Sequence, residues 1–277
     1  MYQGVIVLTV GIFTGSAVLM PWQKTASVAM ETKNIRVALV QFDARPGEVE
    51  QNLAAMERLA RAAVEDRARL VMFHELALSD YMGDMGKYAE PIPEGPSVRR
   101  MERLAGELDC FITFGMPERD GDRLHIAQVF VGPEGFLYRY RKTWLFQDRE
   151  DRGHRNEWAR YNPGQGPELF VIDGIRATCL ICADADAPRS IEQVRSLKPD
   201  LVFFPVNRGA KAFPEYPAKV ARMGAPTLVT NRVGDSHGRD CVGGATVFDA
   251  QGNALAVANR NKKEEILFYN LVVRVAQ

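Results

Sequence analysis

The chain has 277 residues, enough for one large domain or two small ones with a sizeable core. Its 46% apolar and 25% charged residues are typical of a soluble globular protein. Lysine plus arginine equals aspartate plus glutamate, which excludes the strongly basic or acidic balance expected for a nucleic-acid or acidic-membrane partner. Four cysteines in a chain of this length form no disulfide framework and favour a reducing compartment.

The N-terminal segment has some features of a leader. Residues 4–20 carry no charge, and they are marginal as a membrane span. Small residues precede Met30, as at a signal-peptide cleavage site, but the first four residues contain no lysine or arginine. We therefore expect residues 1–30 to be a removable leader or a mis-assigned extension, and residues 31–277 to be one domain. The expected location is the cytoplasm, or export or membrane anchoring if the leader is real.

The first half of the domain alternates predicted strands and helices. Apolar runs rich in β-branched residues predict strands, and apolar residues at helical spacing predict helices. The predicted strands are 35–42, 70–75, 110–115 and a hairpin over 126–141, and the predicted helices are 49–66 and 96–109.

The second half repeats this order. Its predicted strands are 175–182, 201–206, 226–231 and a strand–turn–strand over 245–258, and its predicted helices are 188–198 and 214–224. Helices that alternate with apolar strands predict α/β layers. The hairpins argue against a purely parallel barrel, so we expect two sheets packed face to face with helices outside, in pseudo-symmetric halves.

Cys182 ends an apolar run and admits four interpretations. It forms a CxxC with Cys179, but residues three apart on a strand point to opposite faces, which argues against a redox pair. The four histidines are scattered and there is no second CxxC, which argues against zinc. A small buried thiol and a catalytic nucleophile both remain open.

Two other reactive side chains stand at the ends of predicted strands. Glu75 follows an apolar strand, where a buried carboxylate is costly unless it has a partner. Lys142 follows the first hairpin. A carboxylate can deprotonate a thiol, and an ammonium can stabilise an oxyanion, so Glu75, Lys142 and Cys182 together suggest catalysis. A surface role for Glu75 and for Lys142 also stays open.

These stretches resemble the nitrilase, or carbon–nitrogen hydrolase, superfamily. The resemblance covers about residues 35–272 and includes "VALVQ" at 37–41, "YRYRKTWL" around Lys142, Cys182-Ala183-Asp184, "NRVG" at 231–234 and "GGATVFDAQGN" at 243–253. It implies a four-layer αββα sandwich that forms a homodimer or higher homo-oligomer. It implies an amidase-like hydrolase of amide or N-carbamoyl compounds, less readily of nitriles, with no cofactor and no metal.

The resemblance also implies a mechanism. Glu75 would take the proton of Cys182, the thiolate would attack the substrate carbon, and water would hydrolyse the resulting thioester. Lys142 and the backbone N–H of Ala183 would stabilise the oxyanion. A second glutamate that positions the lysine is expected at Glu150, with Glu157 as the fallback.

Positions around this predicted site depart from the family pattern. His74 stands where proline is usual, and Ala183 replaces an aromatic residue. Tyr81, Ala183, Asn207 and Arg208 are expected to bind substrate. Arg208 either binds a substrate carboxylate or is a surface arginine. A non-catalytic dimeric binding protein and an acyltransferase remain alternative functions, and the substrate is not identified by the sequence.

Overall fold

A computed structural model describes residues 30–276, with no account of the side chains of residues 30, 31, 210–212, 275 and 276. The predicted leader lies outside the described residues. Within them, none of the helices has the length and apolar character needed to cross a membrane. The α-helices are α1 (Val49–Glu65), α2 (Pro96–Leu108), α3 (Pro188–Leu197) and α4 (Tyr216–Met223).

The strands form two large sheets and one small hairpin. They are β1 (Met30–Gln41), β2 (Leu70–Met72), β3 (Phe111–Asp120), β4 (Arg123–Gly132), β5 (Gly135–Arg141), β6 (Phe170–Ile172), β7 (Ile175–Cys179), β8 (Leu201–Pro205), β9 (Thr227–Thr230), β10 (Val233–Ser236), β11 (Arg239–Val242), β12 (Thr246–Phe248), β13 (Ala254–Val257) and β14 (Glu265–Ala276).

The two large sheets repeat one topology. One has the order β14-β1-β2-β3-β4-β5, and the other has the order β6-β7-β8-β9-β12-β13. In each sheet the second, third and fourth strands are parallel and every other pair is antiparallel. The predicted pseudo-symmetry is therefore confirmed at the level of strand order. The β10–β11 hairpin is an addition to the second half.

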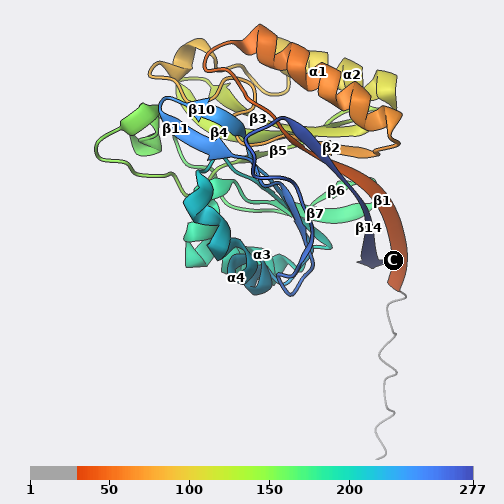
Figure 1. Cartoon of the computed structure of the whole chain (residues 1–277). Coiled ribbons are helices and arrows are strands. Elements are labelled where there is room, and N and C mark those ends of the chain that lie inside the picture. The colour runs from red at the N-terminus through yellow and green to blue at the C-terminus, as the bar shows by residue number, and fades with distance from the viewer. Residues whose placement is uncertain (1–29, 277) are drawn as a thin grey trace, which may run out of the picture.

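Side chains alternate between the two faces of each sheet, and this alternation explains the layers of the fold. Helices α1 and α2 cover one sheet, and α3 and α4 cover the other (Figure 1). Along β1, Val37 and Leu39 belong to the core between the sheets, whereas Ala38 and Val40 belong to the core beneath α1 and α2. A strand that is buried on both faces in this way has a continuous apolar sequence. The predicted αββα sandwich is confirmed.

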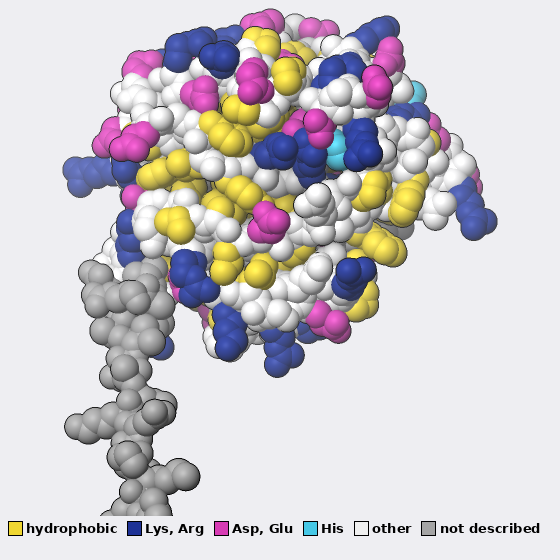
Figure 2. Space-filling model, turned by 180° about the vertical axis from the view of Figure 1, so that it is seen from behind, with side chains coloured by type: hydrophobic (Ala, Val, Ile, Leu, Met, Phe, Trp, Pro, Cys, Tyr) yellow, Lys and Arg dark blue, Asp and Glu magenta, His cyan; other side chains and the backbone are white. Residues whose placement is uncertain are grey.

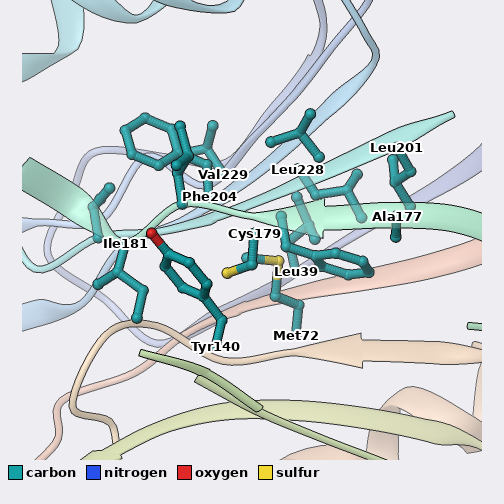
Figure 3. Packing of buried hydrophobic residues seen from close by; sticks show 14 of the residues in the cluster. Leu39, Met72, Tyr140, Ala177, Cys179, Ile181, Leu201, Phe204, Leu228 and Val229 are labelled. Carbon is teal, nitrogen blue, oxygen red and sulfur yellow. The ribbon is translucent and has the colours of Figure 1, made fainter. Parts of the chain in front are cut away.

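Cys179 belongs to the core between the sheets. Its side chain lies among Leu39, Met72 and Tyr140 in the close view (Figure 3), and it is fully buried. Strand β7 ends at this residue, and Cys182 begins the next element. Both cysteines are free thiols, so the CxxC spacing does not indicate a redox pair.

Several elements differ from the prediction. Strands β6 and β14 and the β10–β11 hairpin were not predicted, and the segment before α4 forms a 3₁₀ helix, η5 (Ala210–Glu215). On the face opposite to that of Figure 1, positive and negative side chains are interspersed with hydrophobic ones (Figure 2). That distribution agrees with the zero net charge of the sequence.

Candidate active site

Glu75 and Lys142 meet in the interior of the molecule. Glu75 follows β2 and Lys142 follows β5, and both side chains are fully buried. Lys142 Nζ donates to Glu75 Oε1 at 2.6 Å and to Glu157 Oε1 at 2.7 Å. A surface role for either residue is therefore excluded. The ammonium holds two carboxylates that come from different segments of the chain.

Glu157, and not Glu150, lies beside Lys142. Besides accepting from the lysine, Glu157 accepts from the Tyr81 hydroxyl at 2.6 Å and from the backbone N–H of Phe146 at 2.6 Å. Glu150 points to solvent, with 73% of its side chain exposed, and lies 3.4 Å from Arg152. The prediction that Glu150 is the second glutamate is wrong, and the fallback position has the expected contacts.

The charges of this cluster determine its protonation. Burial alone lowers the pKa of Lys142, but the carboxylates of Glu157 and Glu75 outweigh it and raise that pKa. Burial raises the pKa of Glu157, against the effect of Lys142 and with that of Glu75. Lys142 therefore stays an ammonium. Two of its three N–H groups go to carboxylates, which leaves the third for another acceptor.

Cys182 sits at a strained turn. It begins the 3₁₀ helix η4 (Cys182–Asp186) with a φ of +47°, in the left-handed region that residues other than glycine seldom adopt. Such a conformation persists only where the surroundings hold it, and it occurs most often at functional sites. The turn brings the thiol to the wall of a cavity with 6% of the residue exposed.

Asp184 holds this turn against the segment that carries the lysine. One carboxylate oxygen accepts from the backbone N–H of Ile181 and from the Tyr140 hydroxyl, both at 2.8 Å. The other accepts from the N–H groups of Thr143 and Trp144, at 2.9 and 2.6 Å. No role for Asp184 was predicted from the sequence. The sequence feature that could have indicated a structural role for Asp184 is its position in an apolar segment, two residues after Cys182.

Arg208 contacts the thiol directly. Its Nε donates to Cys182 Sγ at 3.1 Å, and its guanidinium pairs with Asp186 at 2.5 Å. Burial raises the pKa of the Cys182 thiol, whereas the charges of Arg208 and Lys142 act to lower it and that of Glu75 to raise it. Only 14% of the Arg208 side chain is exposed, so it is not a surface arginine.

A cavity of about 680 Å³ opens onto the thiol. Cys182, Tyr81, Asn207 and Arg208 line it, whereas Ala183 is buried and does not. The part of the chain that the structure describes contains no group of three or more histidine, cysteine, aspartate or glutamate side chains suited to a metal ion. Glu157 also lines the cavity, and the lining residues that were not predicted are Phe146, Arg155, Asp186, Gly209, Arg239, Asp240 and Val242.

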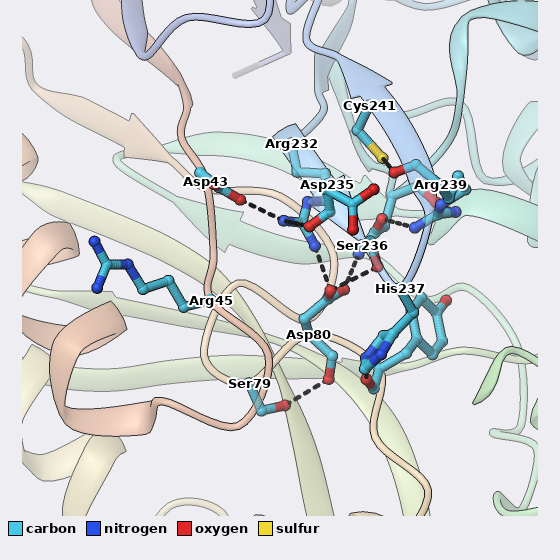
Figure 4. A network of polar contacts seen from close by, with 12 residues as sticks. Asp43, Arg45, Ser79, Asp80, Arg232, Asp235, Ser236, His237, Arg239 and Cys241 are labelled. Carbon is cyan, nitrogen blue, oxygen red and sulfur yellow. Dashed lines mark hydrogen bonds and ion pairs between the residues drawn. The ribbon is translucent and has the colours of Figure 1, made fainter. Parts of the chain in front are cut away.

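A buried polar network supports the loop that follows Glu75. Asp80 accepts from Asn207 Nδ2 at 2.9 Å and from Ser236 Oγ at 2.6 Å, and it pairs with Arg232 (Figure 4). Arg232 is fully buried and also reaches Asp43 at 2.5 Å. The network joins the first half of the domain to the second beside the cavity, and it fixes the residue that precedes Tyr81.

Known proteins of similar sequence include enzymes that act on carbon–nitrogen bonds. A nitrilase from Pyrococcus abyssi is 27% identical over 236 residues, covering 83% of this chain and 87% of the relative. An (R)-stereoselective amidase from a Pseudomonas species is 25% identical over 249 residues, covering 86% and 85%. N-carbamoylputrescine amidase from Solanum lycopersicum is 26% identical over 191 residues, covering 66% and 62%.

Solved structures share the fold. A CN-hydrolase superfamily protein from Xanthomonas campestris, with an arsenic adduct in its active site, superimposes with a TM-score of 0.74 at 22% identity, covering 85% of this chain and 90% of the other. An amidase variant from Nesterenkonia sp. AN1, with acrylamide added to its active-site cysteine, gives 0.76 at 22% identity, covering 86% and 93%. The family model for carbon–nitrogen hydrolases matches residues 36–276, and the chain belongs to that family.

Proposed function

We propose that the protein hydrolyses the carbon–nitrogen bond of a small amide or N-carbamoyl compound through a thioester on Cys182. The observation that carries this proposal is the hydrogen bonding of the Glu75 carboxylate. Its Oε1 accepts from Lys142 at 2.6 Å and from Tyr81 at 3.1 Å, whereas its buried Oε2 has no partner among the described residues. A buried, fixed carboxylate with one free oxygen is suited to accept a proton.

The first half-reaction forms the thioester. Glu75 takes the Sγ proton of Cys182, and the thiolate attacks the substrate carbonyl carbon to give a tetrahedral oxyanion. The remaining N–H of Lys142 and the backbone N–H of Ala183 stabilise that oxyanion. Glu75 then gives its proton to the leaving nitrogen, the carbon–nitrogen bond breaks, and ammonia or an amine departs.

The second half-reaction releases the product. Glu75 accepts a proton from water, the resulting hydroxide attacks the thioester carbon, and the carbon–sulfur bond breaks. The thiolate recovers its proton from Glu75, and a carboxylic or carbamic acid leaves. Arg208 stabilises the thiolate in both halves, because its Nε already donates to Sγ. The amidase and N-carbamoylputrescine amidase relatives support amide and carbamoyl substrates.

An ammonia-release screen over primary amides, N-carbamoyl compounds and nitriles tests the proposal. We expect turnover by the wild type and its loss in Cys182→Ala. Activity retained in Cys182→Ala contradicts the mechanism. Product analysis with an added amine separates hydrolysis from acyl transfer.

Iodoacetamide alkylation tests the base independently of the substrate. Glu75→Gln is expected to slow alkylation of Cys182 by about 10²-fold, the lower end of what a positioned base contributes. Equal rates in the wild type and in Glu75→Gln would exclude Glu75 as the base. They would favour a binding protein on the same fold.

A further inference from the structure

The carboxylates on the cavity wall already have cationic partners. Glu157 pairs with Lys142, and Asp186 pairs with Arg208 and with Lys219. Asp240, at the rim, pairs with Lys262. Each carboxylate of the wall therefore has a cationic partner, and Arg208 has a carboxylate partner.

Arg155 and Arg239 line the same cavity without any such partner. Neither forms an ion pair with a carboxylate of the described residues, and both side chains are partly buried. Arg239 donates to the backbone oxygen of Asn207 at 2.5 Å and to its side-chain oxygen, while its buried Nε has no partner. Arg155 Nε donates only to the backbone oxygen of Arg152, at 2.7 Å.

The charge of Arg239 reaches Arg155. Burial lowers the pKa of Arg155, and the neighbouring charge of Arg239 lowers it further. The charge of Asp148 acts to raise that pKa, but its carboxylate pairs with Arg152 and accepts from the backbone N–H of Glu150. Two partly buried like charges without a counter-ion are costly, and an anion between them would remove that cost.

We propose that Arg155 and Arg239 bind an anionic group of the substrate, so that the enzyme acts on amides or N-carbamoyl compounds that carry a carboxylate. The proposal rests on the proposed function: the reacting carbon lies at Cys182, and the carboxylate lies beside Arg155 and Arg239 on the wall of the same cavity. Guanidinium groups are well suited to a carboxylate, because their N–H groups match its two oxygens. Arg208 is not the carboxylate ligand, because Asp186 satisfies it. A cationic amine at this end would be repelled.

Protection of the thiol by dicarboxylates, which have no carbon–nitrogen bond to hydrolyse, tests the subsite. Short linear dicarboxylates are expected to slow the alkylation of Cys182 by iodoacetamide, whereas the diamides of the same length protect less. Arg155→Gln and Arg239→Gln should each raise the half-protecting dicarboxylate concentration about tenfold or more, and should leave protection by the diamide unchanged. Arg149→Gln is the matched control, because it removes the same charge from an exposed position outside the cavity wall. Equal protection by dicarboxylate and diamide in the wild type, or unchanged protection in both cavity variants, overturns the proposal.

Turnover separates this inference from the proposed function. Three straight-chain primary amides that end in a carboxylate, a methyl ester and an ammonium group are compared by ammonia release. We expect kcat/KM to fall in that order, and Arg155→Gln and Arg239→Gln to reduce it for the carboxylate amide alone. Hydrolysis of all three at equal rates would leave the hydrolase intact and remove the carboxylate subsite. Dicarboxylate protection without hydrolysis of any amide or N-carbamoyl compound would keep the carboxylate subsite and remove the hydrolase.

Discussion

His74 is a fully buried imidazole directly before Glu75. Its Nδ1 lies 3.0 Å from the backbone oxygen of Glu75, its ring lies 5.0 Å from that of Phe42, and its Nε2 has no partner among the described residues. Burial lowers the pKa of His74 from 6.5 to about 4. The folded protein therefore keeps this side chain neutral at a pH where an unfolded chain would protonate it.

We predict that His74 makes the protein sensitive to mild acid. Between pH 6.5 and about pH 4 the unfolded chain binds a proton that the folded protein does not, so the free energy of unfolding falls as the pH falls. Over the whole interval the loss is about 3 kcal/mol. Urea unfolding across this interval should show a flatter pH dependence for His74→Gln. Parallel pH profiles for variant and wild type would contradict the prediction.

Some of the site residues could be identified from the sequence alone. Glu75, Lys142 and Cys182 each follow a strongly apolar strand or hairpin, so they could be placed at strand ends. Arg155 and Arg239 could not be found in this way. They stand in a long connection and in an added hairpin, where no periodicity constrains which side chain faces inward. That neither arginine forms an ion pair within the described residues also could not be inferred from local sequence, because it depends on which distant side chains the fold brings near them.

The connection between β5 and β6 decides which glutamate reaches the lysine. Asp151 accepts from the backbone N–H of Asn156 at 2.9 Å and pairs with Arg160, which ties the 3₁₀ helices η2 (Arg152–His154) and η3 (Glu157–Ala159) together. The folded connection directs the Glu157 side chain toward Lys142 and leaves the Glu150 side chain exposed to solvent. Spacing from Lys142 alone could not distinguish them, because the connection has no regular period.

We predict opposite results for these two glutamates. Glu157→Gln removes a carboxylate from the Lys142 ammonium and should lower kcat by about a hundredfold, since small displacements of reacting groups have effects of that size. Its effect on KM should be smaller, and the pH profile of kcat should shift because the pKa of Lys142 falls. Glu150→Gln is the matched control and should leave activity unchanged and stability within about 0.5 kcal/mol. A Glu157→Gln enzyme with wild-type kcat and pH profile would show that the position of Lys142 does not depend on Glu157.

Strand β14 is an edge strand that the local sequence pattern could not predict. It pairs antiparallel with β1 from Met30↔Ala276 to Gln41↔Glu265, near the opposite end of the chain. Its burial is one-sided, since Leu271 and Val273 are buried while Val272 is 57% exposed. The exposed position is nevertheless apolar, so the alternation that identifies a half-buried strand is absent. The pairing partner could not be inferred from local pattern.

At the scale of the molecule, the site exists because two similar halves face each other. Glu75 and Lys142 follow strands of one sheet, and Cys182 and Arg208 follow strands of the other. The repeated order of strands and helices made the sandwich predictable, since each sheet must bury both faces. The contacts across it, such as Asp184 with Thr143 and Trp144, depend on how the halves dock and could not be predicted.

The buried pair of Arg232 and Asp80 holds the two halves together beside the cavity. Arg232 follows β9 of the second half, and Asp80 follows Glu75 in the first. Both side chains are fully buried, and Asn207 and Ser236 complete the contacts of the carboxylate. Removing one member of such a pair leaves an uncompensated charge in the interior, whereas removing both does not.

We therefore predict that Arg232→Met lowers the free energy of unfolding by about 3–5 kcal/mol, as expected when one partner of a buried pair is lost. The double variant Arg232→Met/Asp80→Asn should recover part of that loss, because no buried charge then lacks its partner. Urea unfolding measures both. Arg58→Met is the control: its pair with Glu264 at 2.8 Å is exposed, with 59% and 41% of the side chains accessible, and such pairs contribute at most about 1 kcal/mol. If the double variant is destabilised by the sum of the two single variants, the pair is not coupled and does not hold the two halves together.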